Sequence, residues 1–231
     1  DGISMDFVVY PPYFERPDAA TMTQFVRDVR ADMEEVGRRQ GRRVRVMARV
    51  PYVQALELGL DWQTWMREHL IDIIVPSHLR PADAFDIRIE EFVALGRETG
   101  VPVIPTLWQA LGFVDGDERP EDEETGRRRY DKPKTREIFQ AQALLFHRAG
   151  ADGLQLGFAA DEWNGRPWLD DLADPEKVLY ADKQYLVDPV ALRPGTFALP
   201  KEPPLAAERT VFLRIADDLP AAAGRAKTTL I

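Results

Sequence analysis

The chain has 231 residues, no cysteine and a net charge of −9, from 30 Lys and Arg against 39 Asp and Glu. The lack of cysteine excludes disulfides, thiolate catalysis and Cys-ligated metals, and the acidic balance argues against nucleic acid or an anionic membrane as partner. No apolar run reaches the ~20 residues that a membrane-spanning helix needs. The sequence does not begin with Met, so export of a longer precursor stays open and the compartment stays undecided.

The opening stretch, residues 1–14, combines a strand pattern with an acid near the end of that strand. Apolar residues alternate along its first half and occur on both faces, as in a buried parallel strand. Asp6 is followed by an aromatic, Pro-rich loop that holds Tyr10 and Tyr13. A carboxylate in that place is typical of a site residue in an α/β fold. The alternative is that Asp6 only caps the loop through backbone amides.

Strand and helix patterns alternate along the rest of the chain. Further strands are expected at residues 43–50, 71–76, 101–107 and 151–158, and helices around residues 25–36, 59–70, 86–100, 135–149 and 175–181. Candidate helix caps follow the usual residue preferences. They are Thr21 or Thr23, Asp61 and Asp86 at the N-termini, and Gly37 or Gly41, Gly100 and Gly150 at the C-termini.

This alternation predicts a parallel sheet with right-handed crossovers, because each strand is followed by a helix. The longer connections follow the strands and carry the acids and rings, which favours a (β/α)8 TIM barrel. A doubly wound sheet is less favoured because the chain lacks a G-x-G-x-x-G loop. Residues 115–134 show no hydrophobic period and predict a long charged loop.

Only five strands are expected, so residues 1–188 would supply about strands 4–8 of the barrel. The remaining three strands would come from a second polypeptide or from an N-terminal segment, because five strands leave two open edges. Residues 189–208 are rich in proline and predict a linker. Residues 209–231 begin with an alternating pattern and predict the start of a β domain or an added strand.

Several residues with useful chemistry follow the expected strands, and two carboxylates are the usual equipment of a glycoside hydrolase. Asp6 and Glu162 are the predicted catalytic pair, with Asp161 as the substitute for Glu162. Aromatic rings stack on sugars, and Arg or His can hold sugar hydroxyls. The predicted substrate-binding residues are Tyr10, Arg49, His78, Trp108, Asp161 and Trp163.

Each of these residues also has a purely structural interpretation. Arg49 could form a structural ion pair with Asp6, His78 could be a surface loop residue, and Trp163 could pack a helix near the end of the chain. The three histidines have no metal-ligand spacing, so no metal and no cofactor are expected.

The pattern D-G-I-x-x-D-F followed by Y-P, at residues 1–14, resembles the fourth-strand region of glycoside hydrolase-like TIM barrels of bacteria. The resemblance extends over residues 1–158. It implies a saccharide substrate and places Asp6 in the site, without assigning the second acid. Fold resemblance alone does not assign function.

The same strand is similar to the chitinase-type pattern D-G-x-D-x-D-x-E. Asp1, Gly2 and Asp6 match it, Ser4 replaces the middle Asp, and Val8 stands where the proton-donating Glu would be. The missing donor argues against chitinase-type cleavage. A glycosidase is therefore the first expectation. A non-catalytic carbohydrate-binding barrel, or a polysaccharide lyase or isomerase, is the alternative.

Overall fold

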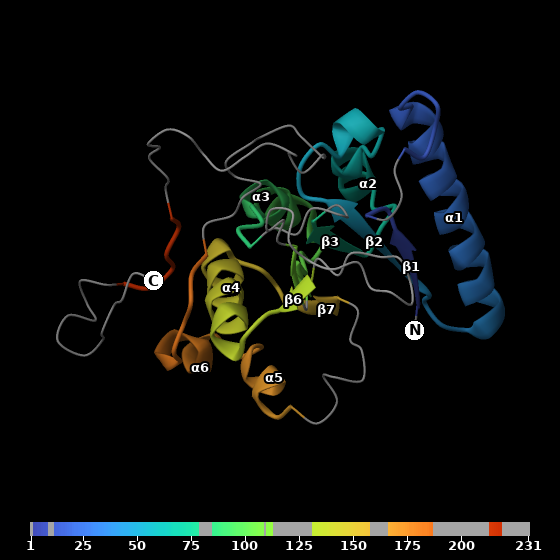
Figure 1. Cartoon of the computed structure of the whole chain (residues 1–231). Coiled ribbons are helices and arrows are strands. Elements are labelled where there is room, and N and C mark those ends of the chain that lie inside the picture. The colour runs from blue at the N-terminus through green and yellow to red at the C-terminus, as the bar shows by residue number, and fades with distance from the viewer. Residues whose placement is uncertain are drawn as a thin grey trace, which may run out of the picture.

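The computed structural model describes residues 2–8, 12–78, 85–108, 110–112, 131–157, 166–186 and 213–218. Strands and helices alternate along this part of the chain (Figure 1). The strands are β1 (Gly2–Asp6), β2 (Arg45–Pro51), β3 (Ile73–Ser77), β4 (Thr106–Trp108), β5 (Ala110–Gly112), β6 (Asp131–Pro133) and β7 (Gln155–Gly157). The helices are α1 (Ala19–Gln40), the short 3-10 helix η1 (Leu56–Leu58), α2 (Trp62–Arg67), α3 (Glu90–Thr99), α4 (Arg136–Ala149), α5 (Trp168–Asp171) and α6 (Pro175–Tyr180).

The parallel strands follow one another in chain order. β1, β2 and β3 form a three-stranded sheet, and β4 and β7 form a two-stranded sheet. A single parallel bridge between Ile74 and Val103 links the two. At this bridge the Ile74 N–H donates to the Pro102 carbonyl, and the Ile104 N–H donates to the Ile74 carbonyl, each at 3.0 Å. β5 and β6 pair antiparallel, a hairpin that the sequence patterns did not predict.

The predicted TIM barrel is wrong. The described residues form parallel sheets of three and two strands with helices, and these sheets do not close. Prolines explain the weak link between them: Pro102 and Pro105 have no N–H, so the expected strand 101–107 is reduced to a bridge and the three residues of β4. The expected β segment near the end of the chain is also not seen in its described part, since residues 213–216 have no regular structure.

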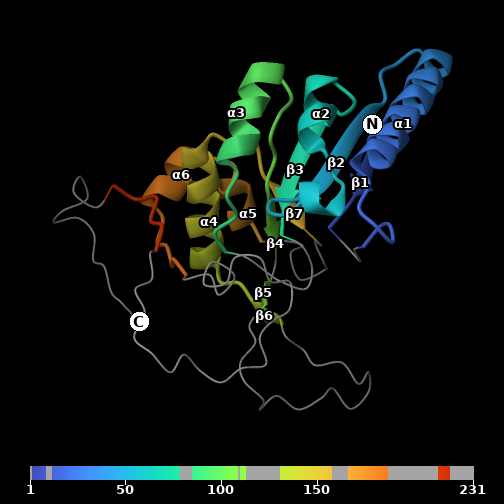
Figure 2. The same ribbon diagram turned by 90° about the horizontal axis from the view of Figure 1, so that it is seen from above.

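Helices cover one face of the parallel strands. α1, α2 and α3 lie side by side along it (Figure 2). Alternate residues of β2 on this face are fully buried, and the Phe7 ring after β1 contacts the Trp65 ring of α2 at 5.4 Å between centroids. The Trp62 ring of α2 stacks on Phe92 of α3 at 4.0 Å. Because strand side chains alternate, the remaining residues of each strand point to the opposite face.

Helix α1 begins one turn before its expected cap. The Asp18 carboxylate accepts the N–H groups of Ala20 and Thr21 at 3.0 and 3.1 Å, so the predicted caps Thr21 and Thr23 are wrong. Thr23 instead lies within α1, and its side chain is buried. At the other end Gly41, one of the two expected stops, has φ 65°, a left-handed conformation that glycine adopts without strain.

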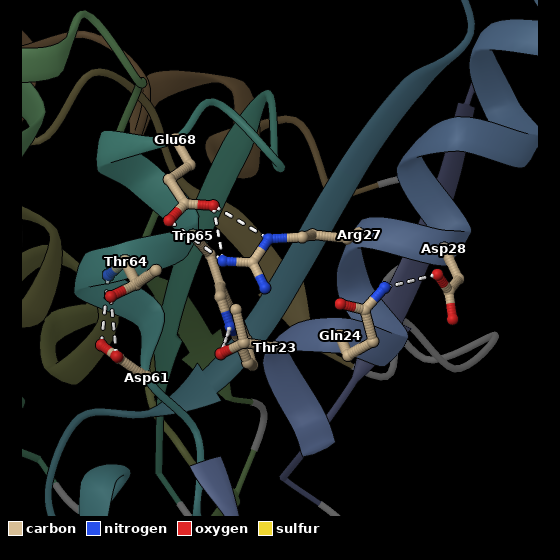
Figure 3. A network of polar contacts seen from close by, with 8 residues as sticks. All are labelled: Thr23, Gln24, Arg27, Asp28, Asp61, Thr64, Trp65 and Glu68. Carbon is tan, nitrogen blue, oxygen red and sulfur yellow. Dashed lines mark hydrogen bonds and ion pairs between the residues drawn. The ribbon is translucent and has the colours of Figure 1, made fainter. Parts of the chain in front are cut away.

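Polar contacts join α1 to α2 (Figure 3). The Arg27 guanidinium forms a two-pronged ion pair with Glu68, at 2.8 Å for its shortest contact. The indole N–H of Trp65 donates to Thr23 Oγ1 at 3.0 Å. Asp61 caps α2 by accepting an N–H of its first turn at 3.1 Å, which confirms that prediction. These contacts fix how the two helices lie on the sheet.

A buried charge cluster lies where β2 and β3 begin. Arg30 Nε donates to the Leu70 carbonyl at 3.0 Å, and its Nη2 pairs with Asp72 Oδ2 at 2.8 Å. Asp72 also accepts the Val46 N–H at 2.8 Å and pairs with Arg43. Burial raises the pKa of Asp72, but the Val46 N–H and the two guanidiniums outweigh it and hold this pKa below its ordinary value.

Residues 213–218 are tied to the body of the protein by side chains. Arg214 forms ion pairs with Asp86, at 3.0 Å, and with Glu90 of α3. Asp86 therefore does not have its predicted role as cap, and α3 begins without a side-chain cap. In the same segment, Asp217 contacts Lys183 at 3.2 Å and Tyr185 at 3.0 Å.

Candidate functional site

The carboxyl ends of four neighbouring strands bring polar and aromatic side chains together. The register pairs Asp6 of β1 with Arg49 of β2, and pairs Pro51, two residues further, with Ser77 of β3. These side chains belong to the sheet face opposite the helices, since the alternate residues face the helix layer. The group formed by Asp6, Arg49, Ser77, His78 and Trp108 is called the Asp6 cluster below.

Asp6 presents a carboxylate that is both fixed and accessible. Its Oδ2 pairs with Arg49 Nη1 at 3.1 Å, and its Oδ1 accepts the Val8 N–H at 3.0 Å. The Asp6 side chain is 41% exposed, whereas the Arg49 side chain is 7% exposed. The ion pair thus has a buried cation and an anion that faces solvent. Such a charge-assisted pair restricts the carboxylate to one orientation.

Arg49 is held by Ser77 and Trp108 as well as by Asp6. Its Nε and Nη2 lie 3.2 and 3.1 Å from Ser77 Oγ, which is fully buried. Its guanidinium carbon lies 5.2 Å from the ring centroid of Trp108, within the range of a cation–π contact. A buried guanidinium is costly unless it is paired and hydrogen-bonded. The carboxylate, hydroxyl and indole together offset that cost and position Arg49 under Asp6.

Trp108 and His78 form the buried floor of the cluster. Their rings meet edge to face with centroids 4.8 Å apart, and both side chains are almost fully buried. Gly157 of β7 leaves room for the indole, because a Cβ at that position would lie 2.6 Å from Trp108 Cε3. In this arrangement Trp108 does not offer an open face for stacking. It supports Arg49 from below.

Tyr13 follows β1 and contacts Phe7, the residue after Asp6. Its hydroxyl donates to the Phe7 carbonyl, and the two rings meet edge to face at 6.0 Å. Burial, helped by the negative charge of Asp6, raises the pKa of Tyr13 to about 12. The hydroxyl therefore stays protonated at neutral pH and acts as a donor, which fixes the start of the loop after β1.

Four of the predicted site residues come together in this way: Asp6, Arg49, His78 and Trp108 are linked by successive contacts. The structural ion pair between Arg49 and Asp6, raised as an alternative, is present. Ser77 was not predicted, although its place directly after the apolar strand 71–76 was a usable signal. The remaining predicted residues lie outside the described part of the chain. They are Tyr10, Asp161, Glu162 and Trp163.

The chemistry available in the cluster is that of a charged carboxylate with fixed orientation beside a guanidinium. It can accept hydrogen bonds from hydroxyls or stabilise a developing positive charge. Among the described residues, no three His, Cys, Asp or Glu side chains are grouped closely enough to hold a metal ion. Within the same residues, none of the helices has the length and apolar character needed to cross a membrane.

The comparisons with known proteins add no family to this picture. No protein-family model matches the chain, and the search of curated proteins found no match either.

Proposed function

We propose that the chain is a glycoside hydrolase that acts on a saccharide at the Asp6 cluster. The observation that carries the proposal is the Asp6 carboxylate, which is exposed at the carboxyl end of β1 with both oxygens held in place by Arg49 and Val8. Hydrolysis of a glycosidic bond proceeds through an oxocarbenium-like transition state, which a fixed carboxylate stabilises as nucleophile or by its charge.

The second acid of the mechanism is proposed to be Glu162, with Asp161 as its substitute. Glycoside hydrolysis commonly uses two carboxyl groups with different roles, and the fixed orientation of the Asp6 carboxylate suits it to the sugar carbon. A separate acid must therefore protonate the leaving oxygen while Asp6 faces the sugar carbon. Water completes the reaction, so that each bond cleaved yields one new reducing end.

The test is reducing-end release from a panel of oligosaccharides of different linkage, comparing wild type with Asp6→Asn. The variant should lose turnover and retain its fold, since Arg49 keeps its contacts with Ser77 and Trp108. Asp152→Asn is the matched control: this carboxylate accepts the Val103 N–H at 2.8 Å, before β7 begins and away from the cluster. Undiminished turnover in Asp6→Asn would remove Asp6 from the mechanism.

A second candidate is saccharide binding without cleavage. The observation that favours it is that little of the cluster is open to solvent apart from Asp6: Arg49 pairs with Asp6, and the rings of His78 and Trp108 are buried. Calorimetry that detects saccharide binding in the absence of any product would support this candidate. Release of an unsaturated sugar that absorbs in the ultraviolet would instead indicate a lyase.

A further inference from the structure

Within the described part of the chain, the three-stranded sheet has one edge without a partner strand, at β1. β1 pairs with β2 on one side, and no described strand pairs with its other side. The Phe7 N–H donates to the Arg49 carbonyl at 2.9 Å, so Phe7 and alternate residues before it direct their backbone groups toward β2. The N–H and C=O groups of Ser4 and Asp6 therefore point to the open side. Such a row of groups is a template for another strand.

Among its described residues, this edge has one charged side chain, Asp6, and few other features that protect against pairing. Residues Gly2–Asp6 contain no lysine and no proline, and the pairing with β2 has no bulge. The side chain of Ile3, on the helix-covered face, is 36% exposed. An open edge that is short of protective features and flanked by apolar surface is typical of a strand that pairs with a partner.

Helix α1 extends the apolar surface beside this edge. Arg27 faces α2 through its ion pair with Glu68, and Phe25 lies about 200° around the helix from Arg27, on the side away from α2. Phe25 is 49% exposed. Half-buried apolar residues continue the same stripe along α1: Val29, Met33 and Val36. Figures 1 and 2 both place α1 and β1 together at one end of the row of elements.

The Gly2 end of the edge lies beside several arginines, although the chain as a whole is acidic. Five arginines lie within residues 38–45, where α1 ends and β2 begins. Arg38 and Arg39 pair with Glu35, and Arg43 pairs with Asp72. Arg45 is exposed and stands directly opposite Gly2, which lies so close to β2 that a Cβ there would be 2.4 Å from the Arg45 carbonyl oxygen. A segment added to β1 would therefore meet a cation at this end.

We propose that the open edge of β1 binds an extended polypeptide segment of a separate protein, with acidic residues at the end that lies beside Gly2. The backbone groups of Ser4 and Asp6 pair with the segment as in a sheet, Ile3 and Phe25 cover its apolar side chains, and Arg45 binds its acidic end. The complementary charge selects a partner segment that carries carboxylates. The inference is independent of any activity at the Asp6 cluster.

The test uses two synthetic peptides of about eight residues, which is within the range of strand lengths. One begins with two glutamates and continues with alternating valine and threonine, and the other begins with two lysines instead. Fluorescence anisotropy should show binding of the glutamate peptide and at least about tenfold weaker binding of the lysine peptide. Hydrogen exchange on the unmodified chain should show the Ser4 and Asp6 amides slowed by the glutamate peptide, whereas the Met5 and Phe7 amides are slow already.

Two variants locate the binding surface. Arg45→Glu and Phe25→Asp should each weaken binding of the glutamate peptide by about tenfold. The matched controls, Arg148→Glu on α4 and Tyr180→Asp on α6, change exposed residues far along the chain and should leave it unchanged. The exchange measurement uses the wild-type chain. The proposal can therefore still be tested if one of the variants fails to fold.

Three results would overturn the proposal. The first is binding of both peptides with equal affinity. The second is binding of the glutamate peptide without slower exchange at Ser4 and Asp6. The third is a dimer in sedimentation velocity in which these two amides are already protected, because a second copy of the chain would then occupy the edge.

Discussion

Replacing Asp72 by Asn would show how much the charge cluster beneath β2 and β3 contributes to stability. The side chains of Arg30 and Asp72 are only 9% and 10% exposed, with nitrogen and oxygen 2.8 Å apart. Removing one partner of a buried ion pair costs about 3–5 kcal/mol, because the other charge stays buried. Asn keeps an oxygen for the Val46 N–H, so we expect the lower value, about 3 kcal/mol. In a chain of this size that lowers Tm by roughly 6–12 °C.

The matched control is Glu68→Gln. Its ion pair with Arg27 has the same 2.8 Å distance, but the two side chains are 40% and 45% exposed. An exposed pair contributes about 0–1 kcal/mol, so this variant should unfold close to wild type. Urea titration followed by far-ultraviolet circular dichroism gives both free energies of unfolding. A loss in Asp72→Asn no larger than that in Glu68→Gln would refute the reasoning.

The same variant has a distinct pH dependence. The pKa of Asp72 is lowered in the folded protein, whereas the unfolded chain has the ordinary value of about 3.9. The stabilisation by its negative charge is therefore complete above about pH 5 and is lost as the pH falls toward the folded pKa. The stability difference between wild type and Asp72→Asn should shrink below about pH 4. A difference that stays constant down to about pH 3 would contradict this.

Two further substitutions probe the surroundings of the Asp6 cluster. Gly157→Ala should cost about 1–3 kcal/mol and alter the near-ultraviolet circular dichroism of Trp108, because the new Cβ would lie 2.6 Å from the indole; an unchanged spectrum and Tm would contradict this. Tyr13→Phe concerns alkaline pH. The pKa of Tyr13 is about 12 against about 10 in the unfolded chain, so wild-type stability should fall as the pH rises from about 10 to 12. The Phe variant should lack that part of the fall, and an identical slope in both proteins would contradict the burial of Tyr13.

The helices could be predicted from the sequence because their signals are local. Asp61 before α2, and Gly41 and Gly150 after α1 and α4, occupy the cap positions expected from residue type. The start of α1 was misplaced because Asp18, Thr21 and Thr23 are all good caps by composition. The contacts in the folded protein determine which of them is the cap. Thr23 is buried against Trp65, and Asp18 caps the helix.

Barrel closure could not be inferred in the same way, because it depends on hydrogen bonds between distant segments. The apolar residues of the segment 101–107 are typical of a strand. Pro102 and Pro105 lack a backbone N–H, however, so two of the hydrogen-bond donors needed for a continuous strand pairing are missing. The pairing of Asp6 with Arg49 was foreseen as an alternative, since both end adjacent parallel strands. The role of Ser77 was not, because it depends on a register that only the structure shows.

The contact of Arg214 with Glu90 determines when parts of the protein can be completed during synthesis. The two residues are 124 positions apart, whereas Arg27 and Glu68, which join α1 to α2, are 41 apart. At about 5–20 residues per second, a ribosome needs roughly 6–25 s to make the 124 residues that separate Glu90 from its partner. The nascent protein therefore has its first two helices ready to join well before the ion pairs of Asp86 and Glu90 with Arg214 can form.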